Sequence, residues 1–434
     1  MPLAQENVSG QPEEADSARD SRPGSGSQAP EGRMTGQKCS DGSTIMPNTL
    51  ARENQSMSLD RREFLAASLA VSAAACQQRI AERQTAATDP EAQPGIPGPY
   101  PGRVVAVDHP GSIVAGEYQR GAVHGMIERG LTELTHAESL VDSLREFFEP
   151  GVVVGIKVNG VGRPYVISDQ TVLHTLVDGL NEAGIPNRDI VVYERTKASF
   201  MGAGFDKWLS EGVRFMNATE TYHRIQLDMD GYDRDVYMEM PLVHPEYAEE
   251  YRVDDPHVRR SYVCKWLSQA VDKVINICVL KHHQSAGVTL ALKNMSHGFV
   301  NNVNRSHATT TANACGIFIP AVVDLPIIRD KVKLHILDGV KGAYHGGPGS
   351  KVGKYTWEHK TMYFATDPVA LDKTGWKVID EKRAEVGVPS IALLKPDEDS
   401  RWLNCQVEHI ELAGNMGLGV YDDEKIRVKR VSLA

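Results

Sequence analysis

The sequence predicts an α/β fold, a mostly parallel sheet flanked by helices, with an inserted cap region. Short runs rich in β-branched residues alternate with helical patterns from about residue 102 onward. The runs are apolar almost throughout, as expected when helices cover both faces of a sheet. Strands that alternate with helices pair mainly in parallel, because each crossover helix returns the chain to the same end of the sheet.

Five apolar runs are the candidate strands, and helical patterns lie among them. The candidate strands are Val104–Val107, Val152–Val158, Ile190–Tyr193, Val274–Leu280 and Lys333–Leu337. The candidate helices span about 120–130, 138–148, 169–183, 263–271 and 367–384. Residues 216–256 are instead acidic and rich in tyrosine, and we expect them to form an insertion or cap in a domain that spans 102–434.

The composition is that of a globular protein. With 41% hydrophobic and 24% charged residues, the chain of 434 residues can bury a sizeable core. Its net charge of −10 and the lack of a dense basic stripe argue against a nucleic-acid partner. None of the six cysteines forms a Cys-x-x-Cys pair, so the sequence has neither an iron–sulfur motif nor a zinc ribbon.

Residues 57–75 have the three parts of an export signal. The paired Arg61-Arg62 is followed by Phe64-Leu65, then by the uncharged run Ala66–Ala75, which ends in small residues. This pattern predicts a twin-arginine signal, a periplasmic location and the twin-arginine translocase as a partner. The apolar run is shorter than the about 20 residues that span a bilayer, so no transmembrane helix is expected in the mature protein.

The segments on either side of the signal are polar and lack apolar periodicity. Residues 1–56 are rich in Gly, Ser, Pro and acidic residues, so we expect a disordered extension, and Met57 is an alternative start. Residues 76–101 are expected to form a linker. Cys76 directly follows the small residues and is a candidate for lipid attachment, but Ala73 stands where a lipobox prefers Leu. A free and a lipid-anchored form both remain open.

Polar residues follow each candidate strand. They are Asp108-His109, Lys157 with Asn159, Glu194-Arg195, Lys281-His282-His283 and Asp338-Gly339. In sheets of this class, ligands bind outside the carboxyl ends of the strands. Since parallel strands end at one edge, we expect these side chains to converge there.

The stretch Lys281–His307 is the densest in candidate functional groups. It contains four histidines, two lysines and an arginine among small residues. Imidazoles beside lysines can act as acids, bases or metal ligands. A lysine near other cations, or partly buried, has a lowered pKa and can act as a nucleophile or form a Schiff base. A single histidine could equally satisfy a buried backbone group, so the prediction depends on the whole stretch.

Several segments resemble a known family in their order and spacing. They are Ile156–Asn159, Lys281–Thr289, Lys293–Gly298, Ile336–Gly339 and Thr366–Asp372. Over roughly residues 103–390 the chain is similar to the "domain of unknown function 362" family. Many members carry an added ferredoxin-like cluster module. This chain lacks the cysteines of that module, so the resemblance implies no fused electron-transfer role here.

A second resemblance concerns a shorter motif. His283, Ala286-Gly287 and Lys293 are spaced like a motif of the nickel-pincer lactate racemases. That resemblance implies an acid/base role for His283, a covalent bond from Lys293 to a nucleotide cofactor, and His297 or His307 as a metal ligand. The chain departs from the motif where Leu290-Ala291-Leu292 replaces the glycines before the lysine.

Together these patterns predict an exported enzyme that acts on a small anionic substrate, with isomerase or oxidoreductase chemistry and a metal or organic cofactor. The catalytic candidates are His283, Lys293, His282 and Lys157. The ligand-binding candidates are Asn159, Lys281, Asn294, Arg305, Asp338 and Asp367, and the metal-ligand candidates are His297 and His307. The alternative is a non-catalytic extracytoplasmic protein that binds an anionic ligand or cofactor.

Overall fold

The computed structural model describes residues 95–434 except 223–225, 248–251, 253, 308–312 and 394–404. The expected extension at 1–56, the signal at 57–75, Cys76 and most of the linker lie outside these residues. None of the described helices is long and apolar enough to cross a membrane.

Within the described residues, nine strands form one sheet. Its order is β13 (Arg427–Ser432), β1 (Arg103–Asp108), β12 (Thr356–Ala365), β11 (Val332–Ala343), β9 (Lys273–His283), β4 (Val154–Lys157), β5 (Ile190–Tyr193) and β6 (Arg214–Met216). The short β10 (Gly287–Val288) pairs with β9. Only β12 and β10 run antiparallel to their neighbours in this sheet. The predicted mostly parallel sheet is therefore confirmed, and every candidate strand lies in it.

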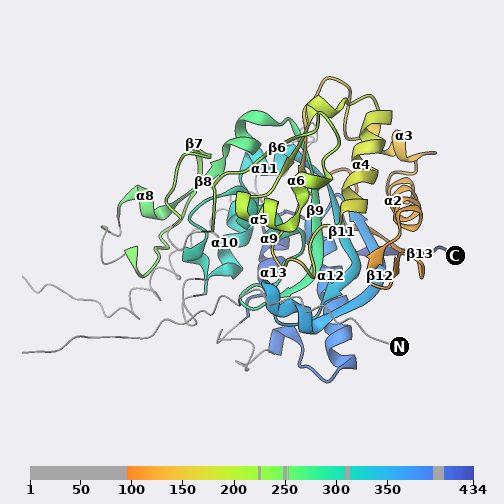
Figure 1. The fold of residues 1–434 in the computed structure, drawn as a ribbon. Coiled ribbons are helices and arrows are strands. Elements are labelled where there is room, and N and C mark those ends of the chain that lie inside the picture. The colour runs from red at the N-terminus through yellow and green to blue at the C-terminus, as the bar shows by residue number, and fades with distance from the viewer. Residues whose placement is uncertain (1–94, 223–225, 248–251, 253, 308–312, 394–404) are drawn as a thin grey trace, which may run out of the picture. The chain divides into compact units, whose positions relative to one another are not determined.

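Helices cover both faces of the sheet (Figure 1). One face packs against α2 (Arg120–Thr135), α3 (Leu140–Arg145) and α4 (Gln170–Glu182). The other packs against α9 (Leu290–Phe299), α10 (Cys315–Val323), α12 (Pro368–Glu385) and α13 (His409–Asn415). Successive strand residues point to opposite faces, so Val274 belongs to one core and Ile275 to the other. Two covered faces explain why the strands are apolar throughout.

The expected helix at 263–271 is confirmed only in part. Its first residues end β8 (Arg260–Cys264), which pairs antiparallel with β7 (Tyr232–Glu239) in a separate two-stranded sheet, and only the π-helical turn η2 (Trp266–Ala270) follows. A cross-strand partner overrides the local helical pattern. Part of the expected insertion at 216–256, including β7, is described; residues 223–225, 248–251 and 253 of it are not.

The strand order reverses between β4 and β9. From β4 the chain moves outward through β5 to β6, whereas from β9 it moves the other way through β11 to β12. The helices at such a reversal lie on opposite faces of the sheet, and the crevice at the carboxyl ends of the two strands is the usual ligand site of an open α/β sheet.

Candidate functional site

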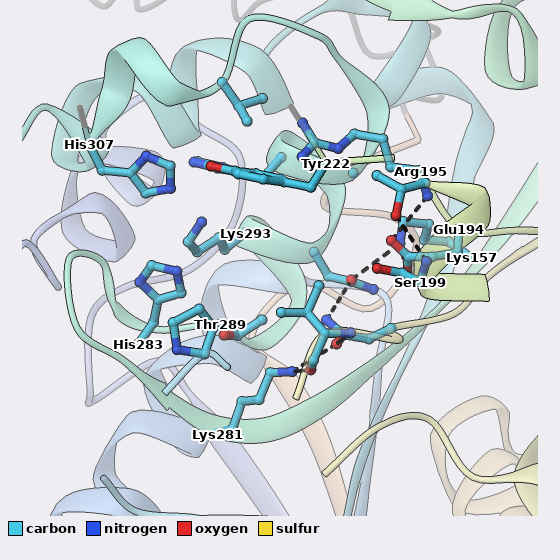
Figure 2. Close-up of a pocket in the computed structure, with 18 of the residues that line it drawn as sticks. Lys157, Glu194, Arg195, Ser199, Tyr222, Lys281, His283, Thr289, Lys293 and His307 are labelled. Atoms are coloured by element: carbon cyan, nitrogen blue, oxygen red, sulfur yellow. Dashed lines mark hydrogen bonds and ion pairs between the residues drawn. The ribbon is translucent and has the colours of Figure 1, made fainter. Parts of the chain in front are cut away.

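A cavity of about 690 Å³ opens at the carboxyl ends of β4, β5 and β9, where the strand order reverses (Figure 2). Its volume is in the range of small-molecule sites. The structure brings eight of the twelve predicted site residues to its wall: Lys157, Asn159, Lys281, His283, Lys293, Asn294, His297 and His307. Other lining residues are Glu194, Arg195, Thr196, Ser199, Tyr222, Thr289 and Asn304.

Lys157, at the end of β4, is held in a buried ion pair. Its Nζ lies 3.0 Å from Oε2 of Glu194, the residue that follows β5. It also donates to the carbonyl of Val158 at 2.5 Å. The Glu194 carboxylate in turn accepts backbone N–H groups of Gly160 and Arg195. Both charges are therefore neutralised within the protein, and Lys157 serves to join β4 to β5.

Lys281, near the end of β9, is buried and donates to groups of the segment that follows β4. Its Nζ lies 2.8 Å from Oδ1 of Asn159 and also contacts the carbonyl of Val161. Burial lowers the pKa of Lys281 to about 7, while nearby Glu194 opposes that shift. These hydrogen bonds thus fix the Lys281 ammonium group in the wall of the cavity.

Asn294 connects helix α9 to the two strands at the reversal point. Its Oδ1 accepts from Nδ2 of Asn159 at 3.0 Å, and its Nδ2 donates to Oδ1 of Asn276 in β9 at 2.7 Å. Asn276 continues the chain of bonds to Nδ1 of His335 at 3.1 Å. This buried network fixes α9, and with it Lys293, relative to the sheet.

Lys293 differs from the other two lysines of the cavity. Only 5% of the residue is exposed, and among the described residues its Nζ has no hydrogen bond or ion pair. Figure 2 shows it extending between the rings of His283 and His307. Burial lowers the pKa of Lys293 to about 8, and Arg195 acts in the same direction. A fraction of this amine is therefore neutral near pH 7.

His283 has a fixed tautomer. Its Nδ1 accepts the backbone N–H groups of Ser285 and Ala286, both at 3.2 Å. The ring proton must then lie on Nε2, which is left as the polar group available to the cavity. Burial lowers the pKa of His283 well below its ordinary value, and the charge of Lys293 adds to this. A neutral His283 can therefore donate from Nε2–H to a group in the cavity, and its expected acid/base role stays a prediction.

His297 has both ring nitrogens occupied. The Ser306 hydroxyl donates to the carbonyl of Val303 at 2.7 Å, so it accepts from Nε2–H of His297 at 3.0 Å. Nδ1 lies 3.0 Å from the Ser296 hydroxyl, whose oxygen also lies 3.4 Å from the carbonyl oxygen of Lys293. The His297 and His307 rings lie 5.2 Å apart between centroids. Among the described residues, no group of three or more His, Cys, Asp or Glu side chains is placed to hold a metal, and the expected metal-ligand roles of His297 and His307 stay predictions.

The structure places Arg305 and His282 away from the cavity. Arg305 is buried and donates to the backbone carbonyls of Met240 and Leu242 at 3.1 and 2.8 Å, so it holds the segment after β7 in place. His282 points away from His283, because neighbouring strand residues face opposite sides, and its ring lies 5.2 Å from that of His345.

Asp338 and Asp367 are also outside the cavity. Asp338 lies within β11 and accepts from the Tyr118 hydroxyl at 3.0 Å. Asp367 caps α12 and accepts the backbone N–H groups of Val369 and Ala370, each at 2.9 Å. An Asp followed by Pro at the start of a helical pattern is typical of an N-cap, so the sequence did contain the signal for this structural role.

The family comparison covers this whole cavity. A model for the domain of unknown function DUF362 matches residues 154–377. This chain belongs to the DUF362 family. Every residue that lines the cavity falls inside the matched segment. The family description names no activity, so the chemistry of the DUF362 cavity has to be inferred from its own residues.

The remaining comparisons are weak. No curated protein matches the chain in sequence. A crystal structure of a Thermotoga maritima protein is similar with 10% identity and a TM-score of 0.32, over 63% of this chain and 60% of that one. This chain thus spans about 60% of the length of that protein.

Twelve lining residues of the DUF362 cavity were not among the predicted site residues, and Glu194 and Tyr222 are two of them. Glu194 was predicted only as a polar residue at the end of a strand, although a carboxylate at that position is a natural ion-pair partner for Lys157. Tyr222 lies in an irregular segment and is 59% exposed, yet its hydroxyl bonds to Asn304 and its ring lies 5.9 Å from the guanidinium of Arg195. No local pattern in the sequence indicates that Tyr222 reaches the cavity.

Proposed function

We propose that this DUF362 protein binds a small anionic molecule in the cavity and acts on it as an enzyme, with Lys293 as the reacting group. The observation that carries the proposal is the imbalance of charge. Four cationic side chains line the cavity, and the one carboxylate among the described lining residues, Glu194, is paired with Lys157. An anionic ligand would complement the remaining positive charge in a partly desolvated site.

Proton transfer next to a carboxyl or carbonyl group is the chemistry that the side chains support. A lysine with a pKa of about 8 can take up a proton near neutral pH. The Nε2–H of His283 can donate to an oxygen that gains negative charge. This favours isomerase-type chemistry. The similarity to nickel-pincer racemases would add His297 or His307 as a metal ligand, and the proposed proton transfer uses neither side chain.

The inserted region at 216–256 would contribute to substrate recognition. Tyr222 belongs to it, lines the cavity and donates from its hydroxyl to Oδ1 of Asn304, which also lines the cavity. We expect the Tyr222 side chain to cover the bound molecule.

Binding and exchange measurements test the enzymatic proposal. Calorimetric titration with small carboxylates would yield binding that falls about 100-fold in Lys293→Met, because a buried charge-assisted contact is lost. Transfer of solvent deuterium to the carbon next to the carboxyl group, followed by NMR, reports turnover. Lys207→Met, on an exposed lysine of α6 (Phe205–Trp208), is the matched control and should change neither result. Equal binding by both variants would contradict the proposal. Binding without any exchange would leave the non-catalytic alternative.

We also propose that the protein is exported by the twin-arginine translocase. The support is the sequence of residues 57–75, with Arg61-Arg62 before an uncharged apolar run. That route carries folded proteins, so a finished cavity could be assembled before export. In cell fractionation, replacement of both arginines by lysine should retain the full chain in the cytoplasm. Unchanged periplasmic recovery would reject this route, and labelling with a lipid precursor would decide whether Cys76 anchors the protein.

A further inference from the structure

We propose that Lys293 forms an imine with the carbonyl group of a small 2-oxo acid. This inference rests on the anion-binding function proposed above and names its substrate class. Three observations carry it: a buried amine that has no partner in the described part of the chain, a fixed hydrogen-bond donor beside it, and a second cation within the same cavity.

The first observation concerns which lysine can react. The Nζ atoms of Lys157 and Lys281 are occupied, by Glu194 and by acceptors that include Asn159. In the described part of the chain, the Nζ of Lys293 has no such partner, although the residue is only 5% exposed. Its lone pair, once the proton is lost, is free to attack a bound molecule. Burial lowers the pKa of Lys293 to about 8, so about one molecule in ten is neutral there at pH 7.

The second observation concerns the carbonyl oxygen. The backbone N–H groups of Ser285 and Ala286 fix the proton of His283 on Nε2. A carbonyl oxygen near this N–H would receive a hydrogen bond that strengthens as negative charge develops during attack. The His283 and His307 rings are nearly parallel, with centroids 6.0 Å apart, so the donor is held in a defined orientation beside Lys293.

The reaction is balanced without an oxidant or a reductant. The Lys293 nitrogen forms a bond to the carbonyl carbon, and the π electrons of the carbonyl move to its oxygen. That oxygen takes up the proton that the nitrogen loses, which gives a carbinolamine. Loss of the oxygen as one water molecule then leaves a carbon–nitrogen double bond. An imine, once protonated, withdraws electrons from the neighbouring carbon and so makes proton transfer there easier.

The third observation explains why the carbonyl compound should be an acid. Arg195 lies close enough to Lys293 to lower the pKa of its amine. It also lines the cavity and is anchored by Gln226, at 3.1 Å from its Nη1. A carboxylate next to the carbonyl would lie between the amine and the guanidinium and would offset their repulsion. The volume of about 690 Å³ leaves room for a side chain on the oxo acid.

Reductive trapping tests the imine directly. The full chain is incubated at pH 7 with glyoxylate, pyruvate or 2-oxoglutarate and sodium cyanoborohydride, and the modified lysines are mapped by peptide mass spectrometry. We expect Lys293 to react roughly 300-fold faster than an exposed lysine, because its neutral fraction at pH 7 is that much larger. Lys293→Met should remove this adduct, whereas Lys207→Met should not. Circular dichroism of both variants checks that they fold.

Matched hydroxy acids separate the two proposals. Glycolate, lactate and 2-hydroxyglutarate have the carboxylate but no carbonyl, so they report anion binding alone by calorimetry. Binding of oxo and hydroxy acids without an adduct on Lys293 would overturn the imine and leave the anion-binding function intact. Failure of every acid to bind would overturn both. Trapping of neutral acetaldehyde on Lys293 as efficiently as glyoxylate would overturn the choice of an acid as substrate.

Discussion

Strands β9 and β11 are neighbours in the sheet and both carry buried ionisable residues toward the same edge, but only β9 delivers them to a cavity. β9 ends at His283, so Lys281 and His283 lie at the crevice where the strand order reverses. β11 continues to Ala343, which leaves Asp338 inside the strand. The side chain of Asp338 lies on the face that α2, α3 and α4 cover and bonds to Tyr118.

Asp338 and Lys293 show different consequences of burying an ionisable group. Burial raises the pKa of Asp338 to about 7, and its Oδ2 has no hydrogen-bond partner within the described ranges, so the folded protein favours the neutral acid more than the unfolded chain does. Lys293 is buried as deeply, but a ligand that enters the cavity can supply the missing charge. A perturbed ionisable group is therefore a stronger indication of a ligand site when a cavity adjoins it.

The largest expected effect is a loss of stability at low pH, which the buried histidines of the cavity should cause. Burial lowers the pKa of His307 to about 3 and lowers those of His283 and His297 as well. The unfolded chain therefore binds more protons below pH 6.5, and stability falls as the pH falls through this range. At pH 5 the cost from His307 alone is about 2 kcal/mol. Urea unfolding at pH 7 and pH 5 measures the loss.

Two variants show whether the cavity causes this loss. His297→Gln should reduce the difference in unfolding free energy between the two pH values. His124→Gln, on an exposed histidine of α2, should leave it unchanged. An equal pH dependence in wild type and both variants would mean that groups elsewhere in the protein control acid stability.

The next effect concerns the ion pair at the cavity wall. Glu194→Gln would leave Lys157 buried without its carboxylate, at 3.0 Å from a neutral amide, and should lower the free energy of unfolding by about 3–5 kcal/mol. Glu182→Gln, on an exposed residue of α4, is the control and should have little effect. Chemical denaturation at pH 7 measures both. A loss below about 1 kcal/mol would show that the pair is solvated.

The third effect is a gain in stability at the expense of function. Lys293 has a pKa of about 8 when folded, against 10.5 ordinarily, so below pH 8 the buried ammonium destabilises the fold. Lys293→Met should therefore raise the free energy of unfolding of the ligand-free protein by about 3 kcal/mol at pH 7. The gain should shrink as the pH rises through 8 toward 10.5. A gain that does not vary with pH would reflect packing rather than charge.

The smallest effect is expected at Asp338. Its pKa of about 7 in the folded protein means that stability falls as the pH rises from about 4 to 7. Asp338→Asn should thus stabilise the protein by about 1 kcal/mol at pH 8, after the cost of an amide N–H without an acceptor, and should not stabilise it at pH 4. Ligand binding in the cavity should not change. A loss of binding in this variant would place Asp338 in the site after all.

Several features could be predicted from local sequence because they depend on neighbouring residues. Apolar runs gave the strands of the sheet, since a strand between two helical layers buries every side chain. Strands β6, β12 and β13 were not predicted from apolar runs. Strand β6 is short, and β12 and β13 include exposed or half-buried residues. Helix α9 was not predicted either, because its sequence lies within the polar stretch Lys281–His307.

The sequence by itself determined the polar strand ends, the dense stretch from Lys281 to His307 and the α/β class, because these follow from short-range pattern. Only the tertiary structure decided which strand ends are adjacent, which face Asp338 occupies and which cavity lysine has no partner among the residues that the structure describes. Lys157 and Lys281 find their partners 37 and 122 residues away. Lys293 finds none among the described residues, and this difference depends on contacts across the whole fold, which no local spacing encodes.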